Sequence, residues 1–401
     1  MDFDRRTSFS CDRVCQPLET WQRIQGVLPS FGITRLSRLT GLDMVGIPVW
    51  NAVSPNAKSI VINQGKGVSD IDARVSAAME ALERQVAASP CVVTVEATAR
   101  ELATAGERYE LLPQLIAAGE SDLDVDEVMI WVKGQDLVNA DIVWIPFHAV
   151  TLDRTSERCR FWQSSDGLAS GNNAAEAVLH GLLERIERDA DVLWRLQSTT
   201  KRLKTCIDPG HFGDSTINSL LEKYAVAGLK LRAFDLTSDI AVPCYAVVCA
   251  DNDILRARQP RFHDITVGYG AHPVAQRAMI RALTEVAQSR LTYISGARDD
   301  VFPETYSRPL APDTQMLFEA EPHAPEDYPA FDEIDSPSSL LESLLHRLKM
   351  MRINSVIAVQ LHAPDLPVAV VKVIVPDLEN PDGARRHRWG PRALAMAIGT
   401  I

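Results

Sequence analysis

The chain has 401 residues and a formal net charge of −12, with 46% hydrophobic and 23% charged residues. This balance is typical of a globular protein, and the length suffices for one large domain or two to three smaller ones. An acidic surface repels phosphate backbones, which disfavours general nucleic-acid binding. The sequence has no apolar run long enough to span a membrane and no apolar core of a secretory signal near its start. We therefore expect a cytoplasmic protein with no membrane or nucleic-acid partner.

One unit recurs three times along the chain: short strands, a glycine-containing segment, and a long alanine-rich helix. Hydrophobic periodicity and turn residues predict these elements. In chain order they are a helix at 18–27, strands at 47–53 and 59–63, a turn at 65–67, a helix at 69–88, a hairpin of 128–132 and 142–152 around 134–141, a loop at 167–171, a helix at 173–197, strands at 229–236 and 242–250, a loop at 264–273, a helix at 274–295, a loop at 301–338, a helix at 340–351, and strands at 355–361 and 368–375.

Hairpins mixed with long helices favour an α+β fold over a doubly wound parallel sheet. We expect mixed sheets packed with the long alanine-rich helices. The predicted organisation is an N-terminal lead-in at 1–34, a core at 35–300, an acidic, proline-rich loop at 301–338, and a C-terminal α/β segment at 339–401 that completes the core.

Two of the long helices carry the same motif, Glu-x-x-Glu-Arg, at 80–84 and 184–188. Carboxylates three residues apart project from one helical face, and their apolar neighbours predict burial. Buried like charges are costly unless a cation neutralises them. Four carboxylates from two helices would suit Mg²⁺, which shares such ligands with phosphate oxygens and water. The alternative is a solvated face with ordinary ion pairs along each helix.

The glycine-containing segments before these helices could bind an anion. Gly65-Lys66-Gly67 allows close backbone approach beside an ammonium, although a plain turn is the simpler interpretation. The P-loop spacing is absent. The segment 164–173 offers amides and hydroxyls at a helix start, where anions bind. Its alternative is a capped helix with Asn172 or Asn173 as the N-cap.

The third long helix places Arg281, Glu285 and Gln288 on one face, four and three residues apart. Gln288 can bind an adenine edge or a carboxylate, and Arg290 can bind phosphate. An ordinary salt-bridged face is the alternative. Two histidines, His263 and His272, flank the preceding loop. Lone histidines are more often structural than catalytic.

Four segments together resemble the YcaO family: GKG at 65–67, SAAMEALER at 76–84, SSDGLASGNNAAEAVLHGLLERIERDA at 164–190, and VGYGAHPVAQRAMIRALTEVAQSRLTYISGARDD at 267–300. The resemblance covers roughly residues 35–300 and implies an α+β nucleotide-binding fold with ATP and Mg²⁺ as cofactors. It implies metal-binding roles for Glu80, Glu83, Glu184 and Glu187, and catalytic roles for Glu83, Glu187 and Arg188. Nucleotide contacts are implied for Lys66, Asn172, Glu176, Arg281, Gln288 and Arg290.

The chemistry implied by this resemblance is ATP-dependent activation of a peptide backbone amide. The chain lacks the proline-rich tail of azoline-forming members, and residues 375–379 together with Gly-Pro-Arg-Ala at 390–393 resemble members that work with a TfuA partner. We therefore expect a thioamide to be installed in a ribosomally made precursor peptide, with a TfuA-like protein and a sulfur donor. Two alternatives stay open: an azoline-forming cyclodehydratase, and a non-catalytic ATP-binding accessory factor for ribosomal protein methylthiolation. The resemblance also leaves a homodimer open.

Overall fold

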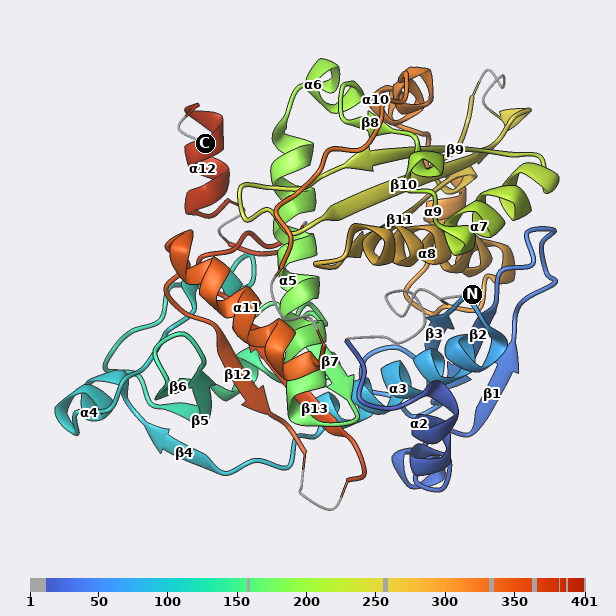
Figure 1. The fold of residues 1–401 in the computed structure, drawn as a ribbon. Coiled ribbons are helices and arrows are strands. Elements are labelled where there is room, and N and C mark those ends of the chain that lie inside the picture. Colours follow the sequence, from blue (N-terminus) through green and yellow to red (C-terminus); the bar gives the residue numbers. More distant parts are fainter. Residues whose placement is uncertain are drawn as a thin grey trace. The chain divides into compact units, whose positions relative to one another are not determined.

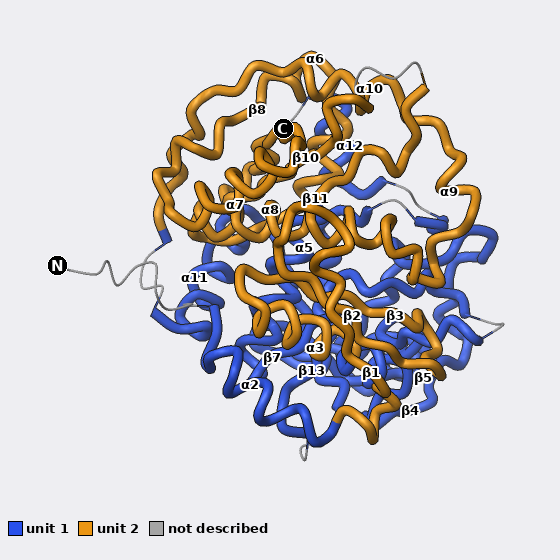
Figure 2. The backbone as a smooth tube through the Cα atoms, turned by 90° about the vertical axis from the view of Figure 1, so that its right-hand side faces the viewer, with its two compact units in different colours: residues 1–27, 82–189, 331–401 blue, residues 28–81, 190–330 orange. Residues whose placement is uncertain are grey.

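The computed structural model describes residues 12–156, 159–254, 259–331, 335–362, 366–381, 383–386 and 389–399. The chain divides into two compact units, coloured separately in Figure 2. The first unit comprises residues 1–27, 82–189 and 331–401, and the second comprises 28–81 and 190–330. The predicted division of the chain into segments at residues 34, 300 and 338 stays a prediction.

The first unit is built on an antiparallel sheet of six strands in the order β4-β5-β12-β13-β7, with β6 also paired to β5. Its central strand β13 is all Val, Ile, Ala and Lys and is buried along its whole length, as expected for a strand covered on both faces. The strands are β4 (Thr94–Ala97), β5 (Met129–Asp136), β6 (Asp141–Pro146), β7 (Leu168–Gly171), β12 (Ile357–Gln360) and β13 (Ala369–Ile374). The helices are α2 (Pro17–Ile24), α4 (Ala99–Thr104), α11 (Pro337–Met350) and α12 (Pro391–Ala397).

The second unit holds two antiparallel sheets, in the orders β1-β2-β3 and β11-β10-β9-β8. Helix α8 shares one hydrophobic core with both sheets, since Val49 of β2, Val247 of β10 and Ala282 of α8 lie in the same buried cluster (Figure 1). The strands are β1 (Arg35–Arg38), β2 (Val49–Val53), β3 (Ile62–Lys66), β8 (Cys206–Ile207), β9 (Leu229–Asp235), β10 (Cys244–Asp251) and β11 (Ile265–Ala271). The helices are α6 (Thr199–Leu203), α7 (Ser215–Val226), α8 (Ala275–Ser295), α9 (Pro303–Ser307) and α10 (Pro312–Met316).

Two long helices contribute residues to both units: α3 (Asp70–Ala88) and α5 (Ala174–Leu196). Both begin where the sequence predicts, because a polar side chain caps the first turn. The Ser69 hydroxyl accepts the N–H of Asp72, and Asn173 accepts the N–H of Glu176 at 2.9 Å. Of the two asparagines considered as the N-cap of α5, Asn173 is therefore the one that caps it.

The glycine-containing segments predicted as turns or loops are strands, and this corrects the sequence analysis. Gly65 lies in β3, Gly171 ends β7, and Gly270 lies in β11. A Cβ at these positions would lie 2.0 Å from a backbone atom of α3, 2.5 Å from one of α5, and 2.1 Å from one of α8. Each glycine therefore allows the following helix to pack directly on its strand, rather than marking a turn.

Further boundaries also differ from prediction. Strand β5 continues through Gly134 to Asp136, and β6 ends at Pro146 rather than at 152. The segment 301–338, predicted as a loop, contains α9, α10 and the start of α11. Each of these helices begins with proline, which is favoured at the first helical position because its missing N–H would have no helical partner there.

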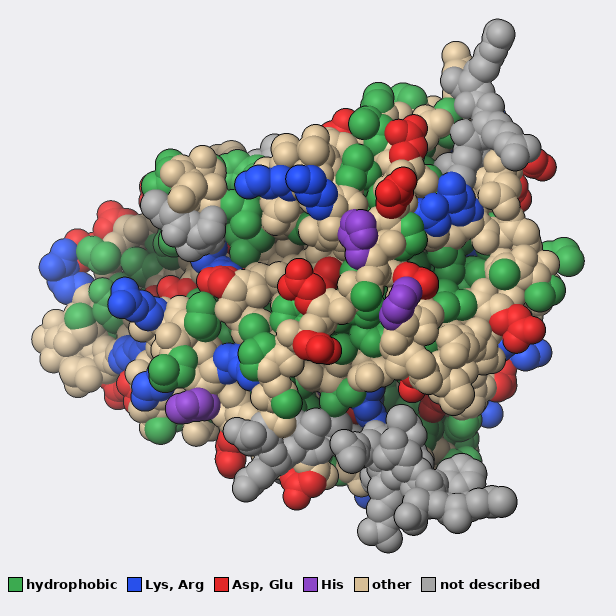
Figure 3. Space-filling model, turned by 45° about the horizontal axis from the view of Figure 1, so that its top comes forward, with side chains coloured by type: hydrophobic (Ala, Val, Ile, Leu, Met, Phe, Trp, Pro, Cys, Tyr) green, Lys and Arg blue, Asp and Glu red, His purple; other side chains and the backbone are tan. Residues whose placement is uncertain are grey.

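Within the described residues, no helix combines the length and the apolar character needed to cross a lipid bilayer. On the face drawn in Figure 3, acidic and basic side chains lie interspersed with hydrophobic and neutral ones. On this face the acidic groups are thus scattered rather than gathered in one continuous area.

Candidate functional site

The carboxylates of the second motif lie one turn apart on α5, within the first unit. Arg188 approaches both of them, with Nη2 3.3 Å from Glu184 Oε1 and Nη1 3.6 Å from Glu187 Oε1. The side chains of Glu184, Arg188 and Glu187 are 25%, 26% and 8% exposed. The motif is therefore largely withdrawn from solvent, which contradicts the alternative of a solvated helix face.

The segment 164–171 gathers both motifs in the first unit. The N–H of Gly167 donates to Glu184 Oε2 at 3.0 Å. The hydroxyl of Ser170 donates to Glu83 Oε2 at 3.2 Å, so the first motif, on α3, reaches the same segment. The first motif's Arg84 donates to the Ser165 hydroxyl at 3.2 Å. Both motifs therefore contact the same segment, through Glu83, Arg84 and Glu184, while the metal site of four carboxylates stays a prediction.

Asp166 is the charged centre of this segment. Its Oδ1 lies 3.7 Å from Arg188 Nε, and its Oδ2 accepts from Arg385 at 3.1 Å. Burial alone would raise the pKa of Asp166, but the positive charges of Arg185 and Arg188 outweigh it and hold the pKa at about 2. Asp166 thus stays ionised and links the arginine of the motif to the C-terminal part of the chain. Sequence analysis did not select it.

Lys372 holds the same segment from the sheet. Its Nζ donates to the backbone oxygens of Ser164 and Asp166 at 2.7 and 2.8 Å. Burial lowers its pKa to about 8, although Asp166 and Glu184 oppose the shift. The signal for Lys372 was present in the sequence, because one lysine within an otherwise apolar strand needs a buried partner.

Glu176 and Asn172 form a buried pair at the start of α5. Asn172 Nδ2 donates to both oxygens of Glu176, at 3.1 and 3.2 Å. The carboxylate also accepts from Arg13 Nη1 at 3.1 Å and from the N–H of Val14 at 3.0 Å. Thr20 donates to Asn172 Oδ1 at 3.0 Å. In this structure the N-terminal segment therefore supplies partners for Asn172 and Glu176, two of the residues predicted to bind the nucleotide.

In the second unit, Lys66 is paired with Glu285 rather than standing alone at a turn. Glu285 also accepts the N–H of Tyr269 at 3.2 Å, so it joins the ends of β3 and β11. Gln288 donates to the Gln64 oxygen of β3 at 3.2 Å. Sequence analysis did not select Glu285 as a site residue, although the spacing of the third helix contained it.

The remaining second-unit candidates lie on α8 and α3. Arg290 Nε lies 3.3 Å from Asp43 Oδ2, so an acid already faces this arginine. Arg281 is half buried one turn before Glu285 on α8. Glu80 is half buried on α3, one turn before Glu83. The nucleotide and metal roles of these residues stay predictions.

Two of the three long helices, α3 and α8, carry an equivalent pair at equivalent places. Glu80 and Glu83 follow Gly65 by 15 and 18 residues, and Glu285 and Gln288 follow Gly270 by the same 15 and 18. Both glycines meet their helix at the residues 8 and 12 positions further on. The recurring unit seen in the sequence is therefore a recurring packing arrangement, in which an amide replaces the second carboxylate on α8.

The two histidines lie apart from this arrangement. His272 is buried, and its Nδ1 accepts the N–H of Val274 at 2.9 Å, which fixes the start of α8. His263 has Nε2 3.4 Å from Asp264 Oδ1 and packs on the ring of Tyr306 at 5.2 Å. Both contacts favour the structural interpretation.

The family model described as YcaO cyclodehydratase, ATP- and Mg²⁺-binding, matches residues 64–379. The chain belongs to the YcaO family. A curated relative, an uncharacterised protein encoded in the tfuA 3′ region of Rhizobium leguminosarum bv. trifolii, is 36% identical over 97% of this chain and 93% of its own length. The expected α+β YcaO fold and the family assignment are thus confirmed.

Two solved structures share the YcaO fold. The YcaO protein from Methanopyrus kandleri, bound with AMPPCP and Mg²⁺, has a TM-score of 0.70 at 23% identity, covering 96% of this chain and 98% of its own. A heterocyclase in complex with substrate and cofactor has a TM-score of 0.75 at 20% identity. This chain corresponds to 55% of that heterocyclase's length. As a YcaO protein, the chain is an ATP-dependent peptide-modifying enzyme with ATP and Mg²⁺ as cofactors.

The donor chemistry of the first unit fits these cofactors. Carboxylate oxygens are the ligands that Mg²⁺ takes in proteins, usually one or two of them beside water and phosphate oxygens. Within the described ranges, no three His, Cys, Asp or Glu side chains stand close enough together to hold a metal ion unaided. A pair such as Glu184 and Glu187 is therefore what the chain offers, and phosphate oxygens and water would complete the coordination.

Proposed function

We propose that this YcaO protein installs a thioamide in the backbone of a ribosomally made peptide, with a TfuA-like partner and a sulfur donor. The carrying observation is the relative encoded in the tfuA 3′ region, which is 36% identical and aligned over nearly its whole length. Relatedness over 93% of that protein makes a shared reaction, rather than a shared domain, the simplest explanation.

The proposed reaction exchanges the oxygen of one amide for sulfur. The sulfur of HS⁻ bonds to the amide carbon, and the amide oxygen bonds to the γ-phosphorus of ATP as ADP leaves. The C–O bond then breaks, and hydrogen phosphate departs with the oxygen and the proton that sulfur brought. ATP is required because phosphate is a far better leaving group than the oxygen of an amide.

The residues of the first unit are proposed to orient the triphosphate and to neutralise its charge. Glu83, Glu184 and Glu187 supply carboxylate oxygens for Mg²⁺. Glu80, which belongs to the second unit, is proposed for the same role. Arg188 binds phosphate oxygens, since its guanidinium presents several N–H donors and remains charged. Nucleotide binding is proposed for Asn172 and Glu176, and, from the second unit, for Lys66, Arg281, Gln288 and Arg290.

Reconstitution tests the proposal. The purified chain is incubated with Mg²⁺-ATP, a TfuA-like protein, sulfide and candidate precursor peptides, and the peptide mass is measured. Exchange of oxygen for sulfur adds about 16 Da, whereas loss of water removes about 18 Da, and each consumes ATP. A peptide that gains about 16 Da only when ATP and sulfide are both present supports thioamidation.

A second candidate is azoline formation by a substrate Cys, Ser or Thr side chain. It is favoured by the family description as a cyclodehydratase and by the fold shared with the heterocyclase. A loss of about 18 Da without any need for sulfide would replace the first proposal with this one. The non-catalytic alternative, an accessory factor for methylthiolation, is weakened because Glu83, Glu184 and Glu187 are all retained. Peptide-dependent phosphate release would exclude it.

A further inference from the structure

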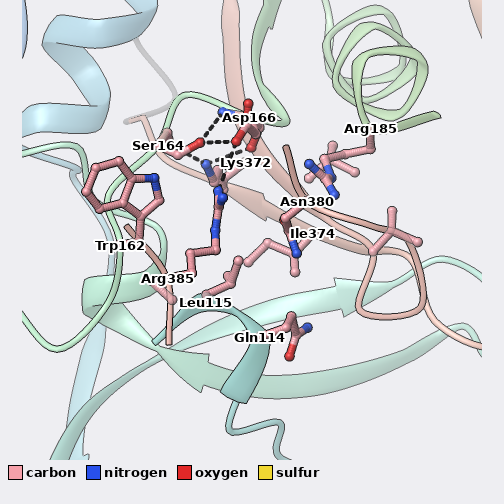
Figure 4. A pocket seen from close by; sticks show the side chains of 13 residues that line it. Gln114, Leu115, Trp162, Ser164, Asp166, Arg185, Lys372, Ile374, Asn380 and Arg385 are labelled. Carbon is pink, nitrogen blue, oxygen red and sulfur yellow. Dashed lines mark hydrogen bonds and ion pairs between the residues drawn. The ribbon is translucent and has the colours of Figure 1, made fainter. Parts of the chain in front are cut away.

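The first unit contains a small cavity on the sheet side of the segment 164–171. It has a volume of about 20 Å³, which is room for one or two water-sized species. Strand β13, helix α5 and the side chains of Asn380 and Arg385 form part of its walls, as Figure 4 shows. The half-buried side chains of Gln114, Trp162 and Asn380 line it and lead toward solvent.

Three buried cationic side chains line the cavity. Arg185, Lys372 and Arg385 line it and are 3%, 6% and 8% exposed, and Asp166 is the one acid among the described lining residues. In Figure 4, Lys372 and Arg385 both reach toward Asp166. Glu184 and Asp189 also act on these cations, so what remains unmet is a requirement for hydrogen-bond acceptors, which burial makes costly.

Two of these cations have buried N–H groups that are not satisfied by the described residues. Arg185 Nη2 donates to the backbone oxygen of Glu379 at 2.6 Å, but its Nη1 has no hydrogen-bond partner. Arg385 Nη1 donates to the Pro381 oxygen at 2.6 Å, while its Nε has none. A buried donor without an acceptor costs free energy, and both donors belong to side chains that line the same cavity.

We propose that this cavity binds a small monovalent anion, and that the physiological anion is hydrosulfide, the nucleophile of the proposed reaction. The two unsatisfied donors belong to arginine guanidinium groups, whose hydrogen bonds to an anion are stronger than those to a neutral molecule. The hydrosulfide assignment rests on the proposed thioamidation, whereas the anion site rests on the cavity alone.

One residue of the cavity also faces the second Glu-x-x-Glu-Arg motif. Asp166 lines it and also faces Arg188, whose Nε lies 3.7 Å from Asp166 Oδ1. Binding of the anion in the cavity makes and breaks no covalent bond, so it needs no oxidant or reductant. It supplies the HS⁻ whose sulfur later bonds to the amide carbon and whose proton leaves with phosphate. The site would raise the local concentration of the nucleophile in the unit that carries Glu184 and Glu187.

Chloride NMR line broadening tests the site in the full-length protein without any turnover. We expect the protein to broaden the chloride resonance and sodium hydrosulfide to reverse the broadening. Arg385→Gln should weaken chloride binding about tenfold, because a charged hydrogen bond is lost. The matched control is Arg386→Gln, since Arg386 lies outside the cavity and donates a hydrogen bond to the backbone oxygen of Glu120 at 2.5 Å. Ala149→Val keeps every charge but fills the cavity, and should also weaken binding.

Each result decides one part of the proposal. Absence of broadening by the wild-type protein, or equal broadening by Arg385→Gln and Ala149→Val, overturns the anion site. Broadening that hydrosulfide cannot reverse overturns the assignment to hydrosulfide. In turnover assays, Arg385→Gln should raise the KM for sulfide about tenfold and leave the KM for ATP unchanged. A peptide that never gains sulfur refutes the proposed reaction, but it does not affect the chloride measurement, so the two failures are distinguishable.

Discussion

Arg392 donates through Nε to both oxygens of the Asp189 carboxylate, at 3.0 and 3.2 Å. Asp189 is fully buried and directly follows the arginine of the second motif on α5. The N–H of Glu379 donates to Asp189 at 2.9 Å, and the Glu379 carboxylate accepts the N–H of Gly390 at 2.8 Å. The start of α12 is thus bound to the helix that carries Glu184 and Glu187.

Arg392→Met should destabilise the protein, because it leaves a buried carboxylate without its cation. We expect a loss of about 3 kcal/mol in the free energy of unfolding, measured by urea denaturation. Arg23 is an exposed arginine on α2, so Arg23→Met serves as the control and should have little effect. Equal stability of the two variants would show that the Arg392–Asp189 pair contributes nothing.

Glu187→Gln should abolish ATP turnover while the fold is retained. The substitution keeps the size of the side chain but removes one carboxylate proposed to bind Mg²⁺, so we expect a loss of about a hundredfold or more in phosphate release. Glu83→Gln should behave in the same way. Glu222→Gln, at an exposed position of α7, is the control. Wild-type turnover in both site variants would reject the metal assignment.

Arg188→Ala should raise the ATP concentration needed for turnover, because the guanidinium proposed to bind phosphate is lost. A charged hydrogen bond is worth about 1.5–3 kcal/mol, so the KM for ATP should rise at least about tenfold. Initial rates over an ATP titration, at saturating peptide, measure this shift. If the KM is unchanged, Arg188 acts only on its neighbours Glu184 and Glu187 and not on the nucleotide.

Asp166→Asn should alter acid stability in a defined direction. The pKa of Asp166 is about 2, below its ordinary value of 3.8, so its charged form stabilises the folded state. This contribution of about 2 kcal/mol is fully present above pH 4 and is lost as the pH falls toward 2. The stability gap between the wild type and Asp166→Asn should therefore shrink over that interval. The exposed Asp253→Asn should show a small gap that does not change.

Arg13→Ala distinguishes two roles for Glu176. If Glu176 binds the nucleotide, Arg13 competes for its carboxylate, and the variant should need less Mg²⁺-ATP for half-maximal turnover. If Glu176 is purely structural, loss of a partner should destabilise the buried acid by about 1–3 kcal/mol without changing the Mg²⁺-ATP requirement. Thermal unfolding and ATP titrations of the same sample separate these outcomes. Arg23→Ala is the matched control.

The sequence predicted the helices of the site well and its strands poorly. The long helices at 69–88, 173–197 and 274–295 start and end within about two residues of α3, α5 and α8, because their periodicity and caps are local signals. The predictions for the glycine-containing segments were wrong, because glycine occurs both in turns and at places where a helix packs closely on a strand. Nothing local separates the two, since the contact at Gly270 depends on Ala278 across a helix start.

The sequence by itself determined the repeated Glu-x-x-Glu-Arg motif, because spacing along a helix is a property of neighbouring residues, and four segments together indicated the family. Only the tertiary structure decided that Asp166, Lys372 and Arg385 meet beside that motif, since Asp166 lies more than 200 residues from each of the other two in the chain. Whether a buried charge is satisfied depends on the atoms that surround it in space. That is why the lysine inside an apolar strand could be noticed in the sequence, but its partners could not be named.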